Sequence, residues 1–201
     1  MSTEQAVAFL DRDGVLNELV VDPRSGTRES PLMAREVRLI PGAAAAAARL
    51  AQAGFALVCV TNQPAAACGK ASIERLLQVH AEVERLLAQA GVALSASRLC
   101  WHHPEGVVPE LTMGCDCRKP APGMLLDAAR AVEADLGASW MVGDTDVDIQ
   151  AGRAAGCRTL LLECQATADR RTDAARADLR AGDLAEGAER MLAYRSSETF
   201  H

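Results

Sequence analysis

The sequence predicts an α/β protein with a doubly wound parallel sheet, because short apolar runs alternate with longer runs of helical periodicity. Residues 7–10 (VAFL) and 55–60 (FALVCV) are apolar and favour strands. Between them lies an Ala-rich helix that opens at Pro41-Gly42 and closes at Gly54. In such a sheet, ligands bind beyond the carboxyl ends of the strands, so the residues after each strand are the candidate functional residues.

The rest of the chain continues this alternation. We expect further strands at 97–101, 140–143 and 158–162, and further helices at 71–90, 122–136, 149–155 and 183–194. Residues 17–38 and 100–118 do not fit the pattern, and long loops in compact domains are often functional. We interpret residues 1–194 as one domain and residues 195–201 as a disordered tail.

Composition and charge exclude several classes of function. The chain has 201 residues and a formal net charge of −6, and it has no basic run that could bind nucleic acid. The acidic balance also argues against anionic membranes as partners. No window approaches the ~18 apolar residues of a membrane span, and the N-terminus does not resemble a signal peptide. We therefore expect a cytoplasmic protein, a monomer or a weak homo-oligomer, whose seven cysteines are thiols or metal ligands rather than disulfides.

Two aspartates follow the first predicted strand. Asp11 and Asp13 are separated by one residue and are followed by Gly14. Carboxylates at this spacing beyond a strand end can converge on one cation, and one can attack phosphorus while the other handles a proton. An ordinary acidic turn would explain the same residues, so this motif is ambiguous alone.

Three other polar segments lie at the ends of predicted elements. Thr61, Asn62 and Gln63 follow the second strand and can hold phosphate oxygens, although Thr-Asn is also common in turns. Arg118 and Lys119 precede a helix, whose N-terminus favours anions. Asp144 and Asp148 follow the strand at 140–143, and carboxylate oxygens suit Mg²⁺. All four segments flank one edge of a parallel sheet, so we expect them to meet there.

The loop at 100–118 contains two tight pairs of metal-binding residues about a dozen positions apart. This spacing favours a closed, tetrahedral zinc site with a structural role. The predicted ligands are Cys100, His102, Cys115 and Cys117. Spacing alone does not decide between His102 and His103, and a set of incidental thiols is the alternative. The other cysteines lie mostly in apolar runs and are better interpreted as core residues.

The four polar segments together resemble the haloacid dehalogenase-like superfamily of phosphatases. The resemblance lies in FLDRDGVLN, VTNQ, RKP and VGDTDVDIQAG, which are spread over most of the chain. It implies that Asp11 is the nucleophile and Asp13 the general acid and base. It further implies that Thr61 and Lys119 hold the phosphoryl group, that Mg²⁺ binds to Asp11, the Asp13 carbonyl and Asp144, and that Asp148 holds the site in place.

The cysteine loop narrows this resemblance to the heptose bisphosphate phosphatases, whose relatives include histidinol phosphatases. The implied substrate is a heptose 1,7-bisphosphate that loses its 7-phosphate, and Arg118 is then a second phosphate contact beside Lys119. A histidinol-phosphate phosphatase or a phosphatase of another small sugar phosphate is the alternative within enzymes. Two further alternatives remain. One is a catalytically silent domain that binds zinc or a partner, and the other is a phosphotransferase.

The sequence departs from the heptose phosphatases in its substrate loops. These enzymes usually follow the second motif with a Ser-Gly-x-x-Arg-Gly type loop, whereas this chain has residues 63–70, QPAAACGK. Lys70 is one candidate to replace the missing arginine, although lysine lacks the bidentate geometry of arginine. The long loop after the first motif carries Arg24, Arg28 and Arg35, any of which could contact a distal phosphate, although a solvated surface charge is the simpler explanation for each. No interval between the motifs is long enough for a cap domain, so we expect an open active site.

Overall fold

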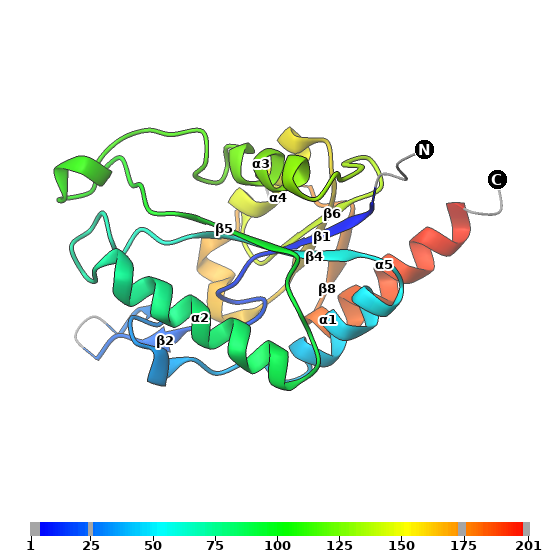
Figure 1. Ribbon diagram of the computed structural model, residues 1–201, viewed down its shortest axis with the longest axis horizontal. Coiled ribbons are helices and arrows are strands. Elements are labelled where there is room, and N and C mark those ends of the chain that lie inside the picture. The colour runs from blue at the N-terminus through cyan, green and yellow to red at the C-terminus, as the bar shows by residue number, and fades with distance from the viewer. Residues whose placement is uncertain (1–4, 24–25, 173–175, 199–201) are drawn as a thin grey trace.

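A parallel sheet of six strands forms the centre of the computed structural model, which describes residues 5–23, 26–172 and 176–198 (Figure 1). The strand order is β5-β4-β1-β6-β7-β8. The strands are β1 (Val7–Leu10), β4 (Ala56–Asn62), β5 (Ala96–Cys100), β6 (Trp140–Gly143), β7 (Arg158–Leu162) and β8 (Leu179–Ala181). The chain proceeds from β1 through β4 to β5, and β6 then pairs with the opposite side of β1. The direction of winding therefore reverses at β1, where such sheets bind ligands.

Helices cover both faces of the sheet (Figure 1). On one face lie α1 (Ala43–Gln52), α2 (Ile73–Gln89) and α5 (Leu184–Glu198), and on the other lie α3 (Gly123–Ala131) and α4 (Asp146–Ala155). Alternate residues of β1 serve the two layers, since Ala8 and Leu10 pack toward α1 and α5 while Val7 and Phe9 pack toward α3 and α4. Both faces are buried, which explains why the strands are continuous apolar runs.

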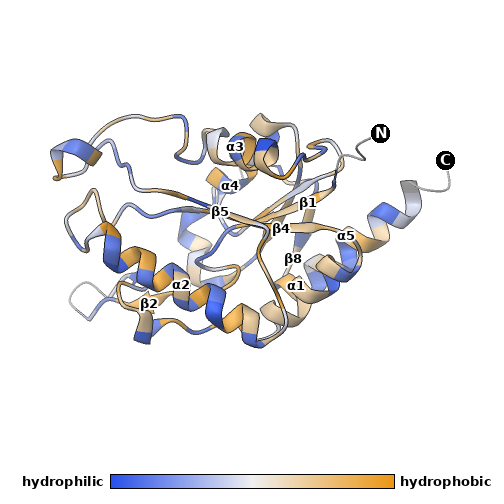
Figure 2. Ribbon diagram, viewed as in Figure 1, coloured by the Kyte–Doolittle hydropathy of each residue, from blue (hydrophilic) through white to orange (hydrophobic). Residues whose placement is uncertain are grey.

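Helix α2 illustrates how the sequence pattern produces this packing. Its buried apolar residues recur at intervals of three and four, so one side of the helix is apolar and the other polar (Figure 2). The side chain of Ser72 caps its N-terminus by accepting a hydrogen bond of 3.3 Å from the backbone of Arg75. Leu76 of α2 also packs against Ala65 and Ala66, so the helix supports the loop that precedes it, residues 63–72.

The predicted α/β architecture with a parallel sheet is confirmed, but several bounds differ from the expectation. Strand β4 extends to Asn62, so Thr61 and Asn62 end the strand rather than follow it. Helix α4 begins at Asp146 instead of 149, because Thr145 and Asp148 form a capping box. Helix α5 continues to Glu198, so residues 195–198 are helical rather than a disordered tail; residues 199–201 lie outside the described part.

The long loop after β1 contains elements that the sequence pattern does not reveal. Strands β2 (Val20–Val21) and β3 (Arg28–Glu29) form a small antiparallel hairpin, and a 3₁₀ helix, η1 (Ala34–Glu36), follows it. Two further 3₁₀ helices are η2 (Pro109–Leu111) in the cysteine loop and η3 (Gln165–Arg170) after β7. Over the described ranges there is no cap domain, and none of the helices there has the length and apolar character needed to span a membrane.

Candidate active site

Two neighbouring strands bring the first pair of carboxylates together. Asp11 directly follows β1 and Asp144 directly follows β6. Strands β1 and β6 pair in parallel with Leu10 opposite Val142, and the backbone N–H of Asp11 donates to the Val142 carbonyl at 3.0 Å. This register places both aspartates at the carboxyl edge of the sheet, beside the point where the winding reverses.

Lys119 and Asp148 complete a buried cluster around these two aspartates. Nζ of Lys119 lies 2.9 Å from Oδ1 of Asp11 and 2.7 Å from Oδ1 of Asp148, and it donates to the Val60 carbonyl at 2.8 Å. Carboxylate oxygens of Asp11, Asp144 and Asp148 all lie within 4.8 Å of one another. One ammonium thus faces three carboxylates, which leaves an excess of negative charge at the centre of the site.

Burial and mutual repulsion shift the ionisation of this cluster. The pKa of Asp11 is raised to about 6 by burial and by the charges of Asp148 and Asp13, against the opposing effect of Lys119. The pKa of Asp144 is raised to about 8 by burial and by the charges of Asp148 and Asp11. Burial acts to lower the pKa of Lys119, but Asp11 and Asp148 outweigh it and raise that pKa, so the lysine is charged.

The cluster fits a divalent cation. Oδ2 of Asp144 is buried and has no hydrogen-bond partner within the described ranges, so a hard oxygen ligand there is available to a metal. The repulsion among the carboxylates contributes to their raised pKa values, and a bound cation would offset that repulsion. Gly14 leaves room for this arrangement: its φ is +91°, and a Cβ there would lie 2.1 Å from Oδ2 of Asp144.

The carboxylate of Asp13 is held by a separate set of hydrogen-bond donors. Its Oδ1 accepts from Arg12 Nε at 3.2 Å and Asn17 Nδ2 at 2.9 Å, and its Oδ2 accepts from Arg12 Nη2 at 2.9 Å and Gln63 Nε2 at 2.6 Å. Burial acts to raise the pKa of Asp13, but the charge of Arg12 and these donors outweigh it and hold the pKa below its ordinary value. A metal ligand from Asp13 would therefore be its backbone carbonyl.

The segment at the end of β4 divides into two roles. Thr61 is buried at the strand end, and its Oγ1 accepts from Gln63 Nε2 at 2.9 Å. The Asn62 side chain is engaged with the backbone of Lys119, donating to its carbonyl at 3.0 Å and accepting from its N–H at 3.1 Å. Asn62 therefore orients Lys119, and Gln63 orients Asp13. Of the three residues, Thr61 is the one best suited to bind a phosphate oxygen, through its hydroxyl.

Residues 165–172 form a strap that fixes the Asp144 loop. The Asp144 carbonyl accepts from Thr167 Oγ1 and from Arg171 Nη1, both at 3.3 Å. Oδ2 of Asp146 accepts from the Thr172 backbone at 2.8 Å and from its hydroxyl at 2.6 Å. On the other side, Oδ2 of Asp148 accepts from the Thr145 hydroxyl at 2.6 Å. The loop that carries Asp144 is thus held from several directions, which preorganises the carboxylates.

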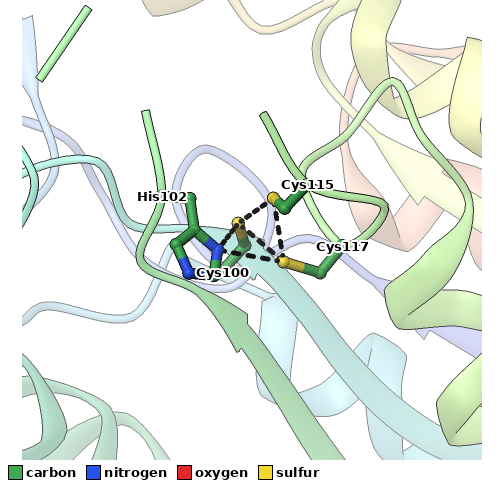
Figure 3. Close-up of side chains that lie close together, drawn as sticks. All are labelled: Cys100, His102, Cys115 and Cys117. Atoms are coloured by element: carbon green, nitrogen blue, oxygen red, sulfur yellow. Dashed lines mark hydrogen bonds between the residues drawn. The ribbon is translucent and has the colours of Figure 1, made fainter. Parts of the chain in front are cut away.

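The predicted zinc ligands form a second cluster (Figure 3). The Cys100 sulfur lies 3.6 Å from that of Cys115 and 3.1 Å from that of Cys117, and Nδ1 of His102 lies 3.4 Å from the Cys117 sulfur. Tetrahedral coordination with Zn–S bonds of about 2.3 Å requires ligand separations of about 3.8 Å, so the ligand atoms need to spread by less than about 1 Å to hold zinc. His103 instead accepts from the Glu105 backbone through Nδ1, at 3.1 Å, so the geometry favours His102.

The cysteine loop also braces the loop that follows β4. The Ala67 carbonyl accepts hydrogen bonds from the backbone N–H groups of Val107, at 2.7 Å, and Val108, at 3.0 Å. Arg118 is half-buried and donates to the His102 carbonyl at 3.3 Å. A metal bound by the cysteines would therefore support the loop at 63–70 as well as the cysteine loop itself.

Sequence reasoning missed the buried arginine of the site and the residues of its rim. Arg12 is fully buried although arginine is usually exposed, and only its position between two aspartates hinted at this role. At the rim, Lys70 forms an ion pair of 2.6 Å with Glu29. Of the three arginines named above as candidate phosphate contacts, Arg28 and Arg35 are exposed and Arg24 lies outside the described residues.

Comparison with known proteins gives concordant results. A family model described as HAD-hydrolase-like matches residues 116–187. A D-glycero-beta-D-manno-heptose-1,7-bisphosphate 7-phosphatase of Yersinia pestis is 40% identical over 162 residues, which cover 81% of this chain and 82% of the relative. The protein of the same name from Bordetella bronchiseptica is 37% identical over 189 residues, which cover 92% of this chain and 96% of the relative.

Solved structures extend the likeness to three dimensions. The D,D-heptose 1,7-bisphosphate phosphatase of B. bronchiseptica, complexed with magnesium and phosphate, is similar with a TM-score of 0.78 and 34% identity, covering 94% of this chain and 99% of that chain. The phosphatase of the same kind from Burkholderia thailandensis has a TM-score of 0.63 at 24% identity, which supports the fold alone.

Proposed function

This chain belongs to the family of D-glycero-D-manno-heptose 1,7-bisphosphate 7-phosphatases within the haloacid dehalogenase-like phosphatases, and we propose that it releases the 7-phosphate of such a substrate through an aspartyl-phosphate on Asp11. The observation that carries this proposal is the convergence of Asp11, Lys119 and Asp144 at the carboxyl edge of the sheet. A charged, preorganised site of this kind suits phosphoryl transfer, which depends mainly on positioning and charge stabilisation.

Asp11 is the carboxylate best suited to attack phosphorus. Its side chain keeps 13% of its exposure, whereas those of Lys119 and Asp148 keep 1% and 0%. Attack by Asp11 forms a bond to phosphorus as the bond to the C7 oxygen breaks, and water then cleaves the acyl-phosphate to free phosphate and the original carboxylate. The contact of Lys119 with Asp11 orients this carboxylate and places a positive charge where the phosphoryl oxygens arrive.

Asp13 moves the protons in both steps. It donates a proton to the leaving C7 oxygen and afterwards accepts one from the attacking water. The clamp formed by Arg12 and Gln63 favours the ionised form, which suits the second step. The negative charge of a bound phosphoryl group opposes that ionisation, so the substrate itself favours the protonated form that the first step needs.

Two metals complete the proposed protein. Mg²⁺ would bind to Asp11, the Asp13 carbonyl and Asp144, and when bound it would neutralise the carboxylates and the phosphoryl oxygens. Thr61 and Lys119 would contact the phosphoryl group, with Arg118 as a further contact. Zn²⁺ would bind to Cys100, His102, Cys115 and Cys117 in a closed site with a structural role.

A panel of substrates tests this proposal. We expect Mg²⁺-dependent phosphate release from both anomers of heptose 1,7-bisphosphate, faster than from fructose 1,6-bisphosphate or histidinol phosphate, with heptose 1-phosphate as the product. Asp11→Asn should abolish release while the circular dichroism spectrum stays unchanged, and Arg190→Gln on the surface of α5 is the matched control. Faster turnover of histidinol phosphate would refute the substrate, and unchanged activity of Asp11→Asn would refute the mechanism.

A further inference from the structure

Two cations from distant parts of the chain reach the same two-residue strand at the rim of the site. Nζ of Lys70, in the loop after β4, lies 2.7 Å and 2.6 Å from the two carboxylate oxygens of Glu29. Nη2 of Arg170, in η3, donates to the carbonyl of Arg28 at 2.5 Å. Arg28 and Glu29 make up strand β3, and a two-stranded hairpin of this size is marginally stable by itself. The hairpin is therefore tied to the body through these two cations.

The two cations line a pocket that adjoins the catalytic residues. The pocket has a volume of about 210 Å³ and is lined by Lys70, Arg170, Glu29, Ser30 and Gln63, among others. Gln63 connects it to the chemistry, because its amide donates to Asp13. Oε1 of Gln63 is buried and, within the described ranges, lacks a hydrogen-bond partner. A ligand in this pocket would therefore be separated from Asp13, the proposed proton donor, by the side chain of Gln63.

Both cations are carried by segments that the structure holds in place. The backbone N–H of Lys70 donates to the Ala65 carbonyl at 2.9 Å, and Ala67 of the same loop is braced by Val107 and Val108. Arg170 precedes Arg171, which anchors the strap to the Asp144 carbonyl. Each cation is thus fixed to a different part of the active site. Lys70 is carried by the loop that follows β4, and Arg170 is carried by the strap that holds the Asp144 loop.

We propose that Lys70 and Arg170 form the subsite for the phosphate of the bisphosphate substrate that is not hydrolysed. This inference rests on the proposed function, because only a substrate with a second phosphate would use the pocket. In the free enzyme Glu29 forms an ion pair with the ammonium of Lys70, so its carboxylate competes with the substrate phosphate for this lysine. A phosphate monoester carries about twice the charge of a carboxylate and has three acceptor oxygens, so it can engage Lys70 and Arg170 together, which Glu29 does not.

Variants that remove one charge at a time test the subsite. The quantity measured is the ratio of kcat/KM for heptose 1,7-bisphosphate to kcat/KM for heptose 7-phosphate. We expect Lys70→Met and Arg170→Gln each to lower this ratio by about tenfold to a hundredfold, the loss typical of a charge-assisted contact. Glu29→Gln should raise the ratio, because it removes the competitor and leaves Lys70 free for the phosphate. Arg190→Gln, an exposed ion-paired arginine on α5, is the control and should leave the ratio unchanged.

The sign of the Glu29 effect separates ligand binding from support of the hairpin. If the Lys70–Glu29 pair only holds the hairpin, Glu29→Gln and Lys70→Met will change the ratio in the same direction, and the inference is wrong. Unchanged ratios in Lys70→Met and Arg170→Gln would overturn it as well, while the proposed function stands. A wild-type protein that releases no phosphate from the bisphosphate would overturn the proposed function, and this inference with it.

Discussion

Gln63 donates a hydrogen bond of 2.6 Å from its side-chain amide to Oδ2 of Asp13. The same oxygen accepts from Arg12, so one carboxylate oxygen is held by a neutral donor and a charged one. Gln63 also contacts Thr61, and it therefore links the group that handles the proton to a group proposed to hold the phosphoryl oxygens. The residue acts through its neighbours and is a positioning residue in this site.

Removal of this amide should weaken catalysis and change its pH dependence. We expect Gln63→Leu to lower kcat by about tenfold or more, because Asp13 loses a donor that orients it. The loss of a donor to the ionised carboxylate should also raise the pKa of Asp13, so the limb of the pH–rate profile that reports Asp13 should move to higher pH. An unchanged profile with a reduced kcat would indicate a steric effect instead.

Lys119 supports both activity and stability. Its ammonium lies between Asp11 and Asp148, and removal of one partner of a buried ion pair typically costs about 3–5 kcal/mol. We expect Lys119→Met to lose most phosphatase activity and to unfold at a clearly lower temperature without Mg²⁺. Lys119→Arg should not restore activity, because the buried space accommodates an ammonium with three contacts, including the Val60 carbonyl. Thermal unfolding and phosphate release measure the two effects separately.

The raised pKa values predict that stabilisation by Mg²⁺ grows with pH. The pKa of Asp144 is about 8 in the folded protein against 3.8 ordinarily, so its contribution to metal-free stability is complete below pH 3.8 and is lost as pH rises through 8. The contribution of Asp11 is lost in the same way as pH rises through its pKa of about 6. A bound cation requires the ionised carboxylates. The increase in Tm caused by Mg²⁺ should therefore be larger at pH 8 than at pH 6, and much smaller in Asp144→Asn at either pH.

Much of this site could be predicted from the sequence, because the strands that position it are apolar runs with clear ends. Strands β1, β6 and β7 have the predicted bounds, so the positions of Asp11 directly after β1 and of Asp144 directly after β6 could be predicted as well. The clamp around Asp13 could not be predicted, since the position of Arg12 between two aspartates does not show that its side chain is buried. The same holds for the hairpin, whose strands have two residues each and are too short for periodicity to appear.

Loss of the cysteine-bound metal should affect substrate binding before it affects the chemistry. The cysteine loop braces Ala67 through two backbone hydrogen bonds, and Ala67 belongs to the loop that presents Lys70. We expect Cys117→Ser to lose about one equivalent of zinc and to raise KM for the bisphosphate more than it lowers kcat. Asp11 and Asp144 follow β1 and β6, and Lys119, although it is two residues from Cys117, is also held by the Val60 carbonyl and by Asn62 of β4. Metal content is measured by atomic absorption, with Mg²⁺ in excess so that the catalytic site stays filled. Cys157→Ser, a buried cysteine outside the cluster, is the matched control and should keep its zinc. A Cys117→Ser protein with full zinc content, or with kcat and KM both unchanged, would contradict this role for the loop.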